Sequence, residues 1–343
     1  MIGMKSPFTG KQMKKVYEKR TWKFRGEQYE YVHTAWQCVD SGELFTTDET
    51  DDLGFTQVTN QYRVKYGIPF TDEIVSVRKK YEVSAARMSL ILGIGINQWR
   101  HYESGEVPNV SNGRMIRSIM NPETFLDYVH SSKHLLDENE YLKLIKKVEC
   151  LVASSKVSEL GSYVHSRIFI YERGRENGYG KQSLEHLKNV LLYIIENCKE
   201  IFYTKMNKIL FFADFVAYSK YGTSITGLTY RALDYGPVPE RWDRIYSQFD
   251  EIIQVPRLVG GVEGTELQST AKANRDALSH AELEVLNEVC SRFASISAAE
   301  ISRISHEEEA WLKCKDSYDL IPYEFAFGLR GMSEVGADGR LCC

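Results

Sequence analysis

The chain has 343 residues, of which 43% are hydrophobic and 26% charged, and its formal net charge at pH 7 is −4. This composition is ordinary for a soluble globular protein, and the length favours two or three domains. No apolar run approaches the roughly 18 residues of a membrane span, and the first residues lack the apolar core of a secretory signal. The seven cysteines are scattered and do not form a disulfide framework. We therefore expect a cytoplasmic protein without membrane contact.

Residues 1–47 read as short β-strands. The stretch VYEKRTWKFRGEQYEYVHTAWQCV alternates, is rich in Val, Tyr, Trp and Thr, and has a turn residue at Gly26. The first 37 residues hold eight Lys or Arg against three Glu. This basic excess on an acidic chain indicates an anionic partner, and an ordinary solvated surface is the equal alternative.

The same segment resembles the zinc-ribbon part of MqsA/YgiT-like antitoxins, in which two CxxC pairs bind Zn²⁺. The spacing persists in Ser6-x-x-Thr9 and Cys38-x-x-Ser41, but Cys38 is the sole thiol at these four positions. Structural zinc requires thiolate or imidazole ligands, and His33 lies outside the spacing. We therefore predict a zinc-ribbon-like β module over residues 1–60 that holds no metal and no other cofactor. Its shape would depend on the aromatic residues Phe8, Tyr17, Trp22, Phe24, Tyr31 and Trp36.

Between residues 61 and 130 the apolar period becomes helical. In YEVSAARMSLILGIGINQWRHYESG, Ser84 is placed to cap a first helix, and glycines from Gly93 to Gly95 supply a tight turn. A second helix from about Gly95 to Ser104 would bury Trp99 and Tyr102. This order of helix, glycine turn and short helix predicts a helix-turn-helix DNA-binding domain.

The outward side of the second helix carries side chains that read bases. Asn and Gln pair with adenine in the major groove and Arg pairs with guanine, and the first residues of a recognition helix reach the base edges. The predicted base contacts are Asn97, Gln98, Arg100 and His101. The predicted phosphate contacts, which position the protein without reading sequence, are Ser84, Lys79, Lys80, Arg87 and Arg114. A short solvated helix in an all-α bundle is the alternative.

The stretch LGIGINQWRHYESGEVP resembles the Cro/C1 class of phage-repressor helix-turn-helix. In that class an Arg of the first helix pairs with a Glu that closes the recognition helix, and Arg78 and Glu103 occupy those positions. The resemblance therefore implies a structural ion pair between them. Residues 1–130 as a whole resemble regulators of the MqsA/YgiT type, and a palindromic operator in double-stranded DNA would require a homodimer. Residues 131–180 are predicted to be a helical linker that can also serve dimerisation.

Residues 181–330 carry a second resemblance. The phrases KILFFADFVAYSKYGTSITGLTYRALDYGPVPE and SISAAEISRISHEEEAW resemble the Panacea domain, which also occurs in SocA-like antitoxins. The resemblance implies a mainly helical domain that neutralises a partner toxin by direct binding, and in the SocA-like case delivers it to a protease. Residues 331–343 are predicted to be a tail.

The loop YGPVPE is the candidate for recognition within this domain. Its prolines fix φ and stiffen the chain, so that little entropy is lost on binding. The predicted toxin contacts are Tyr235, Gly236, Pro237, Pro239 and Trp242. A purely architectural turn is the equal alternative.

The sequence offers no catalytic motif. SHEEEAW lacks the second histidine of HExxH, because Ala310 stands at that position. Ser305 with Glu308 predicts a helix capping box instead. No Walker loop, nucleophile elbow or paired CxxC is present, so we predict no catalytic residues.

Together these features predict a mainly α protein with a small β N-terminal module. Its predicted function is that of a type II antitoxin that binds its toxin through the Panacea domain and autoregulates its operon through the helix-turn-helix. The alternatives are a transcription regulator with a ligand- or partner-sensing C-terminal domain, a proteolytic adaptor for the toxin, and an enzyme of the Panacea domain itself.

Overall fold

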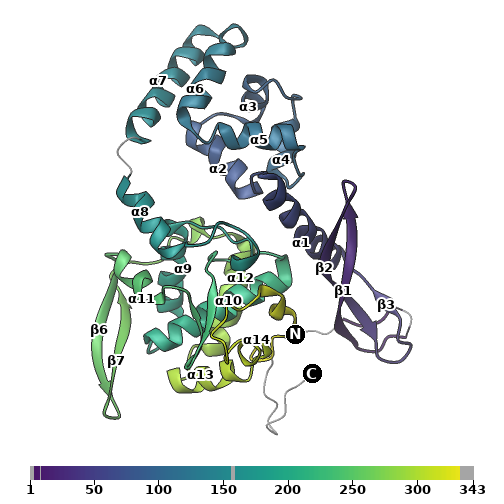
Figure 1. Cartoon of the computed structure of the whole chain (residues 1–343), viewed down its shortest axis with the longest axis vertical. Helices are drawn as coiled ribbons and strands as arrows, with labels where there is room; N and C mark the ends of the chain where they lie inside the picture. The colour runs from purple at the N-terminus through teal and green to yellow at the C-terminus, as the bar shows by residue number, and fades with distance from the viewer. Residues whose placement is uncertain (1–3, 8, 156–158, 333–343) are drawn as a thin grey trace. The chain divides into compact units, whose positions relative to one another are not determined.

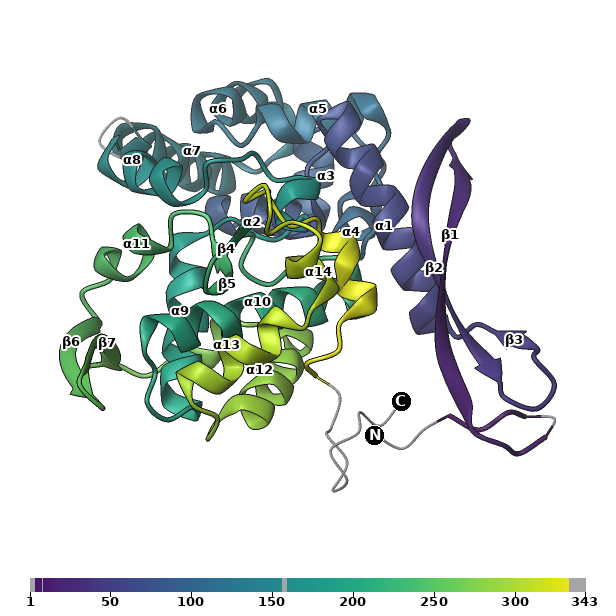
Figure 2. The same cartoon turned by 60° about the horizontal axis from the view of Figure 1, so that its bottom comes forward.

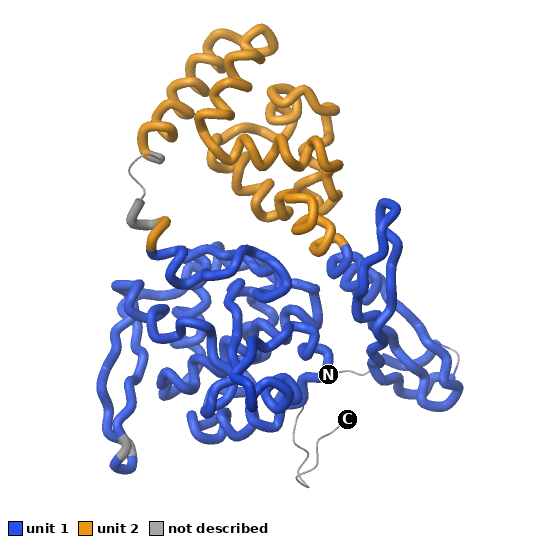
Figure 3. Tube along the Cα trace, in the orientation of Figure 1, with its two compact units in different colours: residues 1–58, 164–343 blue, residues 59–163 orange. Residues whose placement is uncertain are grey.

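The computed structural model describes residues 4–7, 9–155 and 159–332. The chain divides into two compact units, one of residues 1–58 with 164–343 and one of residues 59–163 (Figure 3). Most of the regular structure is helical, and the described strands pair in small antiparallel sheets (Figure 1), which confirms the predicted class of a mainly α chain with a small N-terminal β module. Within the described ranges, every helix is too short or too polar to serve as a membrane span. The predicted tail lies outside these ranges, apart from Gly331 and Met332.

The N-terminal sheet is built on one long hairpin. Strands β1 (Met13–Phe24) and β2 (Glu27–Cys38) are antiparallel, and β3 (Leu44–Phe45) pairs with the other edge of β2 (Figure 1). The turn residues Arg25 and Gly26 have φ of 48° and 90°, which suits a two-residue hairpin turn that follows the strand twist. The predicted strands are therefore present, but as two long strands instead of several short ones, because pairing continues without a break up to the turn.

Helix α1 (Asp48–Tyr66) packs on this hairpin. The ring of Phe55 lies against Trp22 and Phe24, with centroid distances of 6.1 and 6.0 Å. A Cβ atom at Gly54 would lie 3.0 Å from the Tyr31 ring, so glycine permits the close approach. The boundary predicted between residues 60 and 61 falls inside α1, so no linker separates the two segments there.

Residues 59–163 form a helical bundle. It contains the end of α1, all of α2 (Thr71–Tyr81), α3 (Ala85–Ile91), α4 (Gln98–Glu103), α5 (Val110–Ser118), α6 (Pro122–Ser131), η1 (Lys133–Leu135) and α7 (Glu138–Ser155), and the start of α8 (Glu159–Ile168). Val148 of α7 is fully buried in the same core as Trp99 and Phe125. The segment predicted as a linker from residue 131 therefore contributes a helix to the bundle.

The C-terminal domain is organised around helix α10 (Tyr203–Tyr221), in which every residue from Lys205 to Tyr218 is buried. A helix buried on all sides lies at the centre of a domain, and neighbouring helices surround α10 (Figure 2). The helices α12 (His280–Phe293), α13 (Ala298–His306) and η5 (Tyr323–Gly328) pack on α10. The domain also contains α9 (Leu184–Asn197), α11 (Trp242–Ile245), α14 (Glu309–Leu312), η2 (Arg175–Asn177), η3 (Tyr246–Gln248) and η4 (Arg275–Ala277). Two hairpins complete the domain, β4 (Tyr230–Leu233) with β5 (Gly236–Pro239), and β6 (Ile252–Val259) with β7 (Val262–Ser269).

Candidate functional site

The segment predicted as a helix-turn-helix consists of the short helices α3 and α4, joined by a turn at Gly93. The Ser84 side chain accepts a hydrogen bond from the backbone N of Arg87 at 3.2 Å and so caps α3. Gly93 has φ of +66°, whereas Gly95 has no positive φ, so one glycine carries the left-handed turn. Helix α4 begins at Gln98, later than the sequence predicts, and Trp99 is fully buried with its backbone N bonded to Ser89 Oγ at 3.1 Å.

Four predicted base contacts lie at the start of α4, but they are not equally available. Asn97, Arg100 and His101 are exposed, and Gln98 is half-buried. Gln98 Nε2 donates to Glu106 Oε1 at 3.0 Å, and His101 Nδ1 lies 3.7 Å from Glu106 Oε2. Asn97 and Arg100 have no side-chain partner among the described residues. Sequence reasoning did not single out Glu106, because no local pattern shows which side chains it contacts.

The Arg78 and Glu103 side chains lie together, with Arg78 Nε 2.6 Å from Glu103 Oε1. The same carboxylate oxygen accepts the indole N–H of Trp99 at 3.0 Å. Arg78 also donates to the carbonyl of Val83 at 3.3 Å. Glu103 therefore ties the end of α4 to α2 and orients the buried Trp99 ring.

The predicted phosphate contacts divide into engaged and unengaged groups. Arg87 forms two hydrogen bonds to Glu140 of α7, one of 3.1 Å and one of 2.5 Å, and Lys80 Nζ donates to the carbonyl of Met120 at 3.0 Å. Lys79 and Arg114 are exposed and have no ion-pair partner among the described residues. These two cations are the ones best placed to meet a phosphate.

The predicted zinc-ribbon positions come together at one end of the N-terminal sheet. Thr9 Oγ1 lies 3.2 Å from Cys38 Sγ, and the backbone N of Thr9 donates to Ser6 Oγ at 3.3 Å. Hydrogen bonds from the backbone and hydroxyl of Ser41 and from Thr9 lower the pKa of the Cys38 thiol to about 6. Hydroxyl groups thus surround the remaining thiol at positions where the resembled proteins carry cysteines. Phe8, expected to contribute to this module, lies outside the described residues.

The YGPVPE segment forms the second strand of the β4–β5 hairpin rather than a loop. Gly236, Pro237 and Pro239 are buried in β5, so they present no side chain to a partner, and their role is to hold the turn at Asp234 and Tyr235. Gly236 has φ of +99°, and a Cβ atom there would lie 2.6 Å from Ser305 Oγ. Tyr235 at the turn is 76% exposed. Trp242 of α11 is half-buried, with its ring 5.6 Å from that of Tyr203.

Aromatic residues from the end of the domain gather beside this turn. Trp311 Nε1 donates to the carbonyl of Leu233 at 2.8 Å, and the Tyr318 hydroxyl donates to Asp234 Oδ1 at 2.7 Å. Tyr318 is 47% exposed and Leu312 is 45% exposed. The Tyr235 surface is defined here as Tyr235, Trp311, Leu312 and Tyr318. Sequence reasoning missed its last three members, because they lie about 80 residues beyond the hairpin.

The predicted capping box of Ser305 and Glu308 is wrong. Ser305 lies inside α13, where its hydroxyl donates to the carbonyl of Ser302 at 2.8 Å. Glu308 is 1% exposed and accepts hydrogen bonds from the backbone N of Arg330 and Gly331. The spacing predicted that Glu308 would cap a helix, but its carboxylate instead binds the backbone at Arg330 and Gly331.

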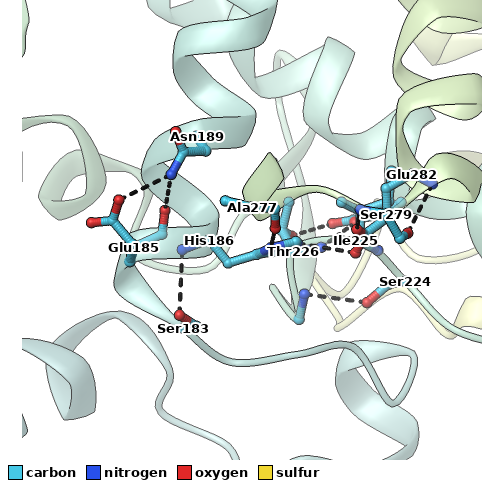
Figure 4. Close-up of polar contacts among 12 residues, drawn as sticks. Ser183, Glu185, His186, Asn189, Ser224, Ile225, Thr226, Ala277, Ser279 and Glu282 are labelled. Atoms are coloured by element: carbon cyan, nitrogen blue, oxygen red, sulfur yellow. Dashed lines mark hydrogen bonds and ion pairs between the residues drawn. The ribbon is translucent and has the colours of Figure 1, made fainter. Parts of the chain in front are cut away.

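Two clusters of polar contacts lie in the C-terminal domain, and Figure 4 labels Ile225 and Thr226 of the first and His186, Ala277 and Glu282 of the second. Asp214 of α10 accepts hydrogen bonds from the backbone N of Ile225 and Thr226 at 2.8 Å each, from the Tyr230 hydroxyl at 2.7 Å and from the Thr226 hydroxyl. Burial raises the pKa of Asp214 to about 6.

In the second cluster, His186 of α9 lies between the Ala277 carbonyl, 3.3 Å from Nδ1, and Glu282 Oε1, 3.1 Å from Nε2. The two clusters join α10 to β4 and α9 to α12.

Lys208 of α10 lies beneath the hairpin turn. It is fully buried, its Nζ donates to the carbonyl of Pro237 at 2.9 Å, and burial lowers its pKa to about 7. The unfolded chain holds this proton up to a pKa of 10.5, whereas the folded protein releases it above about 7. The contribution of Lys208 to stability is therefore complete above the unfolded pKa and is lost as the pH falls to about 7.

We expect the stability of the wild type relative to Lys208→Met to rise by about 3 kcal/mol between pH 6 and pH 9. Urea unfolding at both pH values measures this difference. Lys272→Met, at an exposed position, is the control and should show no such change. A Lys208→Met difference that is independent of pH would contradict the prediction.

Comparison with known proteins adds one finding for this domain. Residues 206–312 match the family model described as "Antitoxin SocA-like, Panacea domain". The matched segment runs from α10 to α14 and includes the β4–β5 hairpin. No curated protein and no solved structure matches the chain. Residues 206–312 in the C-terminal part of this chain are therefore similar to the SocA-like Panacea antitoxin domain.

Proposed function

We propose that this chain is a type II antitoxin that acts in the cytoplasm and neutralises a cognate toxin by direct binding through its Panacea domain. The match of residues 206–312 to the SocA-like antitoxin family carries this proposal. In the same proposal, the helix-turn-helix binds the operator of the toxin–antitoxin genes as a homodimer.

The geometry of the β4–β5 hairpin supports direct binding. The turn is anchored by the buried Lys208, by the buried prolines of β5 and by Ser302, whose hydroxyl donates to the carbonyl of Tyr235 at 3.0 Å. A turn held in this way loses little conformational entropy when a partner binds. Tyr and Trp are enriched among the residues that dominate binding energy, and the Tyr235 surface offers two Tyr and one Trp.

The arrangement of α4 supports operator binding. Asn97 and Arg100 project from the start of a short helix whose opposite side is anchored by Trp99 and Tyr102, which are buried. Their amide and guanidinium groups have the chemistry for adenine and guanine edges. Lys79 and Arg114 would contact phosphates, and Glu106 would reduce the contribution of Gln98.

The decisive experiment is expression of the open reading frame adjacent to this gene, with and without this protein. We expect that frame to stop growth alone and to be harmless when the two are co-expressed. Unchanged toxin abundance in the rescued cells would mean masking, and loss of the toxin would mean delivery to a protease. A harmless neighbour would refute the antitoxin proposal and favour a regulator that senses a ligand.

Tyr235→Ala is expected to weaken toxin binding by at least about 30-fold, because truncation of a central aromatic contact costs about 2 kcal/mol or more. Binding of the purified pair by calorimetry measures this. Leu258→Ala is the matched control, since Leu258 is 70% exposed on the β6–β7 hairpin of the same domain. Equal affinities of the two variants would remove the Tyr235 surface from the toxin interface.

A further inference from the structure

The outer half of the β1–β2 hairpin presents a polar face. Lys19, Thr21 and Lys23 of β1 lie on one side of the strand, because side chains alternate with a period of two. In the antiparallel register, Thr21 is opposite Glu30 and Lys23 is opposite Gln28, and opposite residues share a face. All five side chains are exposed. This set, Lys19, Thr21, Lys23, Gln28 and Glu30, is called the ribbon face.

The two lysines of the ribbon face, like Lys14, differ from three other cations of β1 and its turn. Arg20 is bound by Glu18 at 2.7 Å, Lys15 lies over the Trp36 ring at 5.2 Å, and Arg25 lies over the Phe24 ring at 5.3 Å. Lys19 and Lys23 have no ion-pair or ring partner among the described residues. Their charges are therefore uncompensated by the fold.

The opposite side of the hairpin is used for packing. Trp22 and Phe24 face Phe55 of α1, as described above. The alternation thus directs Trp22 and Phe24 to α1 and leaves the five ribbon-face residues on the other side, where Tyr17, two positions before Lys19, contacts Phe327. Lys19 and Lys23 therefore lie on the side of the hairpin that does not face Phe55.

We propose that the ribbon face binds the phosphate backbone of double-stranded DNA. Lys23 lies four positions after Lys19 in an extended strand, so their Cα atoms are about 13 Å apart. This distance is close to the width of the major groove, which is about 12 Å. A strand that lies across the groove would therefore bring the two ammonium groups to phosphates on its two sides. Thr21 and Gln28 lie between them and offer further hydrogen-bonding groups. Glu30 is the acid on this face, and it limits the net attraction.

This inference rests on the DNA-binding part of the proposed function and extends it to a second element of the chain. The helix-turn-helix would read sequence, whereas the ribbon face would add affinity that does not depend on sequence. Lysines on an edge strand also discourage strand-to-strand association. If the lysines only protect the edge strand, replacing Lys19 and Lys23 should cause aggregation without changing DNA affinity. This outcome distinguishes protection of the edge from DNA binding.

The test uses the full-length chain and the double variant Lys19→Gln with Lys23→Gln. The probes are a fluorescent duplex of mixed sequence and a duplex of the region immediately upstream of this gene. Each phosphate contact adds about 0.9 to the slope of log affinity against log salt concentration. We expect the variant slope to be smaller by about 1.8, so that the wild-type advantage shrinks about 12-fold between about 50 and about 200 mM salt.

The control is Lys181→Gln with Lys272→Gln, which makes the same charge change at exposed positions of the C-terminal domain. Circular dichroism and size-exclusion chromatography check that both double variants are folded and monodisperse. An unchanged slope in the Lys19/Lys23 variant overturns the inference, whether the variant aggregates or stays soluble. Weaker toxin binding with an unchanged slope overturns it too, and assigns the ribbon face to the toxin.

The outcomes also separate this inference from the proposed function. A wild-type protein that prefers upstream DNA, with no slope change in the variant, leaves operator binding intact and removes the ribbon face from it. A wild-type protein without sequence preference, whose slope falls in the variant, overturns operator recognition and supports the ribbon face.

Discussion

Replacing Asp214 by alanine is expected to destabilise the C-terminal domain by about 4 kcal/mol or more. The carboxylate is fully buried and accepts hydrogen bonds from two backbone N–H groups and two hydroxyls. Alanine would leave all four donors without a partner, and each stranded donor costs about 1–3 kcal/mol. Domains are stable by about 5–15 kcal/mol, so this one change removes a large part of that margin.

Urea unfolding followed by circular dichroism measures the effect. Asp250→Ala is the matched control, because Asp250 is an exposed carboxylate of the same domain, and its loss should change stability by no more than about 0.5 kcal/mol. Thr226→Val removes one hydroxyl and keeps the carboxylate, so it should have an intermediate effect. An unfolding midpoint of Asp214→Ala equal to that of the control would refute the account of this cluster.

The double substitution Asn97→Ala with Arg100→Ala is expected to abolish operator preference. Each bidentate contact contributes about 1–3 kcal/mol of discrimination, so loss of both costs about 2–6 kcal/mol per half-site, or about 30-fold to about 10⁴-fold in affinity. Binding to mixed-sequence DNA should persist, because phosphate contacts carry it. Toxin neutralisation should be unaffected, because neither side chain belongs to the Panacea domain.

Competition binding with upstream and mixed-sequence duplexes measures the loss. The control is Asn139→Ala with Lys146→Ala, which removes one amide and one cation from exposed positions of α7. A third variant, Gln98→Ala, should lose less than Asn97→Ala, because Glu106 already engages the Gln98 amide. Loss of neutralisation in the Asn97/Arg100 variant would refute the separation of the protein into a DNA-binding part and a toxin-binding part.

The two proposed functions depend on different supports within the chain. Helix α4, the proposed recognition helix, has six residues, and its orientation depends on Glu103, which holds both Arg78 and the Trp99 indole. The β4–β5 turn depends on Lys208, Pro237 and Asp214, which are buried. Substitutions at these buried or ion-paired residues should lower stability or shift the α4 helix and the β4–β5 turn. Substitutions at Asn97, Arg100 and Tyr235 should instead remove contacts with a partner.

Features that depend on neighbours in the chain could be predicted from the sequence. The alternation predicts strands on both sides of a turn at Gly26, Ser84 caps α3, and the apolar spacing places Trp99 and Tyr102 in a core. Each follows from backbone geometry within a few residues. The phrases of the Panacea resemblance likewise coincide with the segment that matches the family model.

Tertiary structure decided which polar groups are free. Arg87 and Gln98 look equivalent to Lys79 and Asn97 in the sequence, but Glu140 and Glu106 occupy the first two. The boundary near residue 60 lies inside α1, and the prolines of β5 are buried instead of exposed. The Tyr235 surface unites residues about 80 positions apart. The sequence determined which side chains are present at the predicted sites. The fold decided which of them are exposed and unpaired, because burial and ion pairing depend on contacts between distant segments.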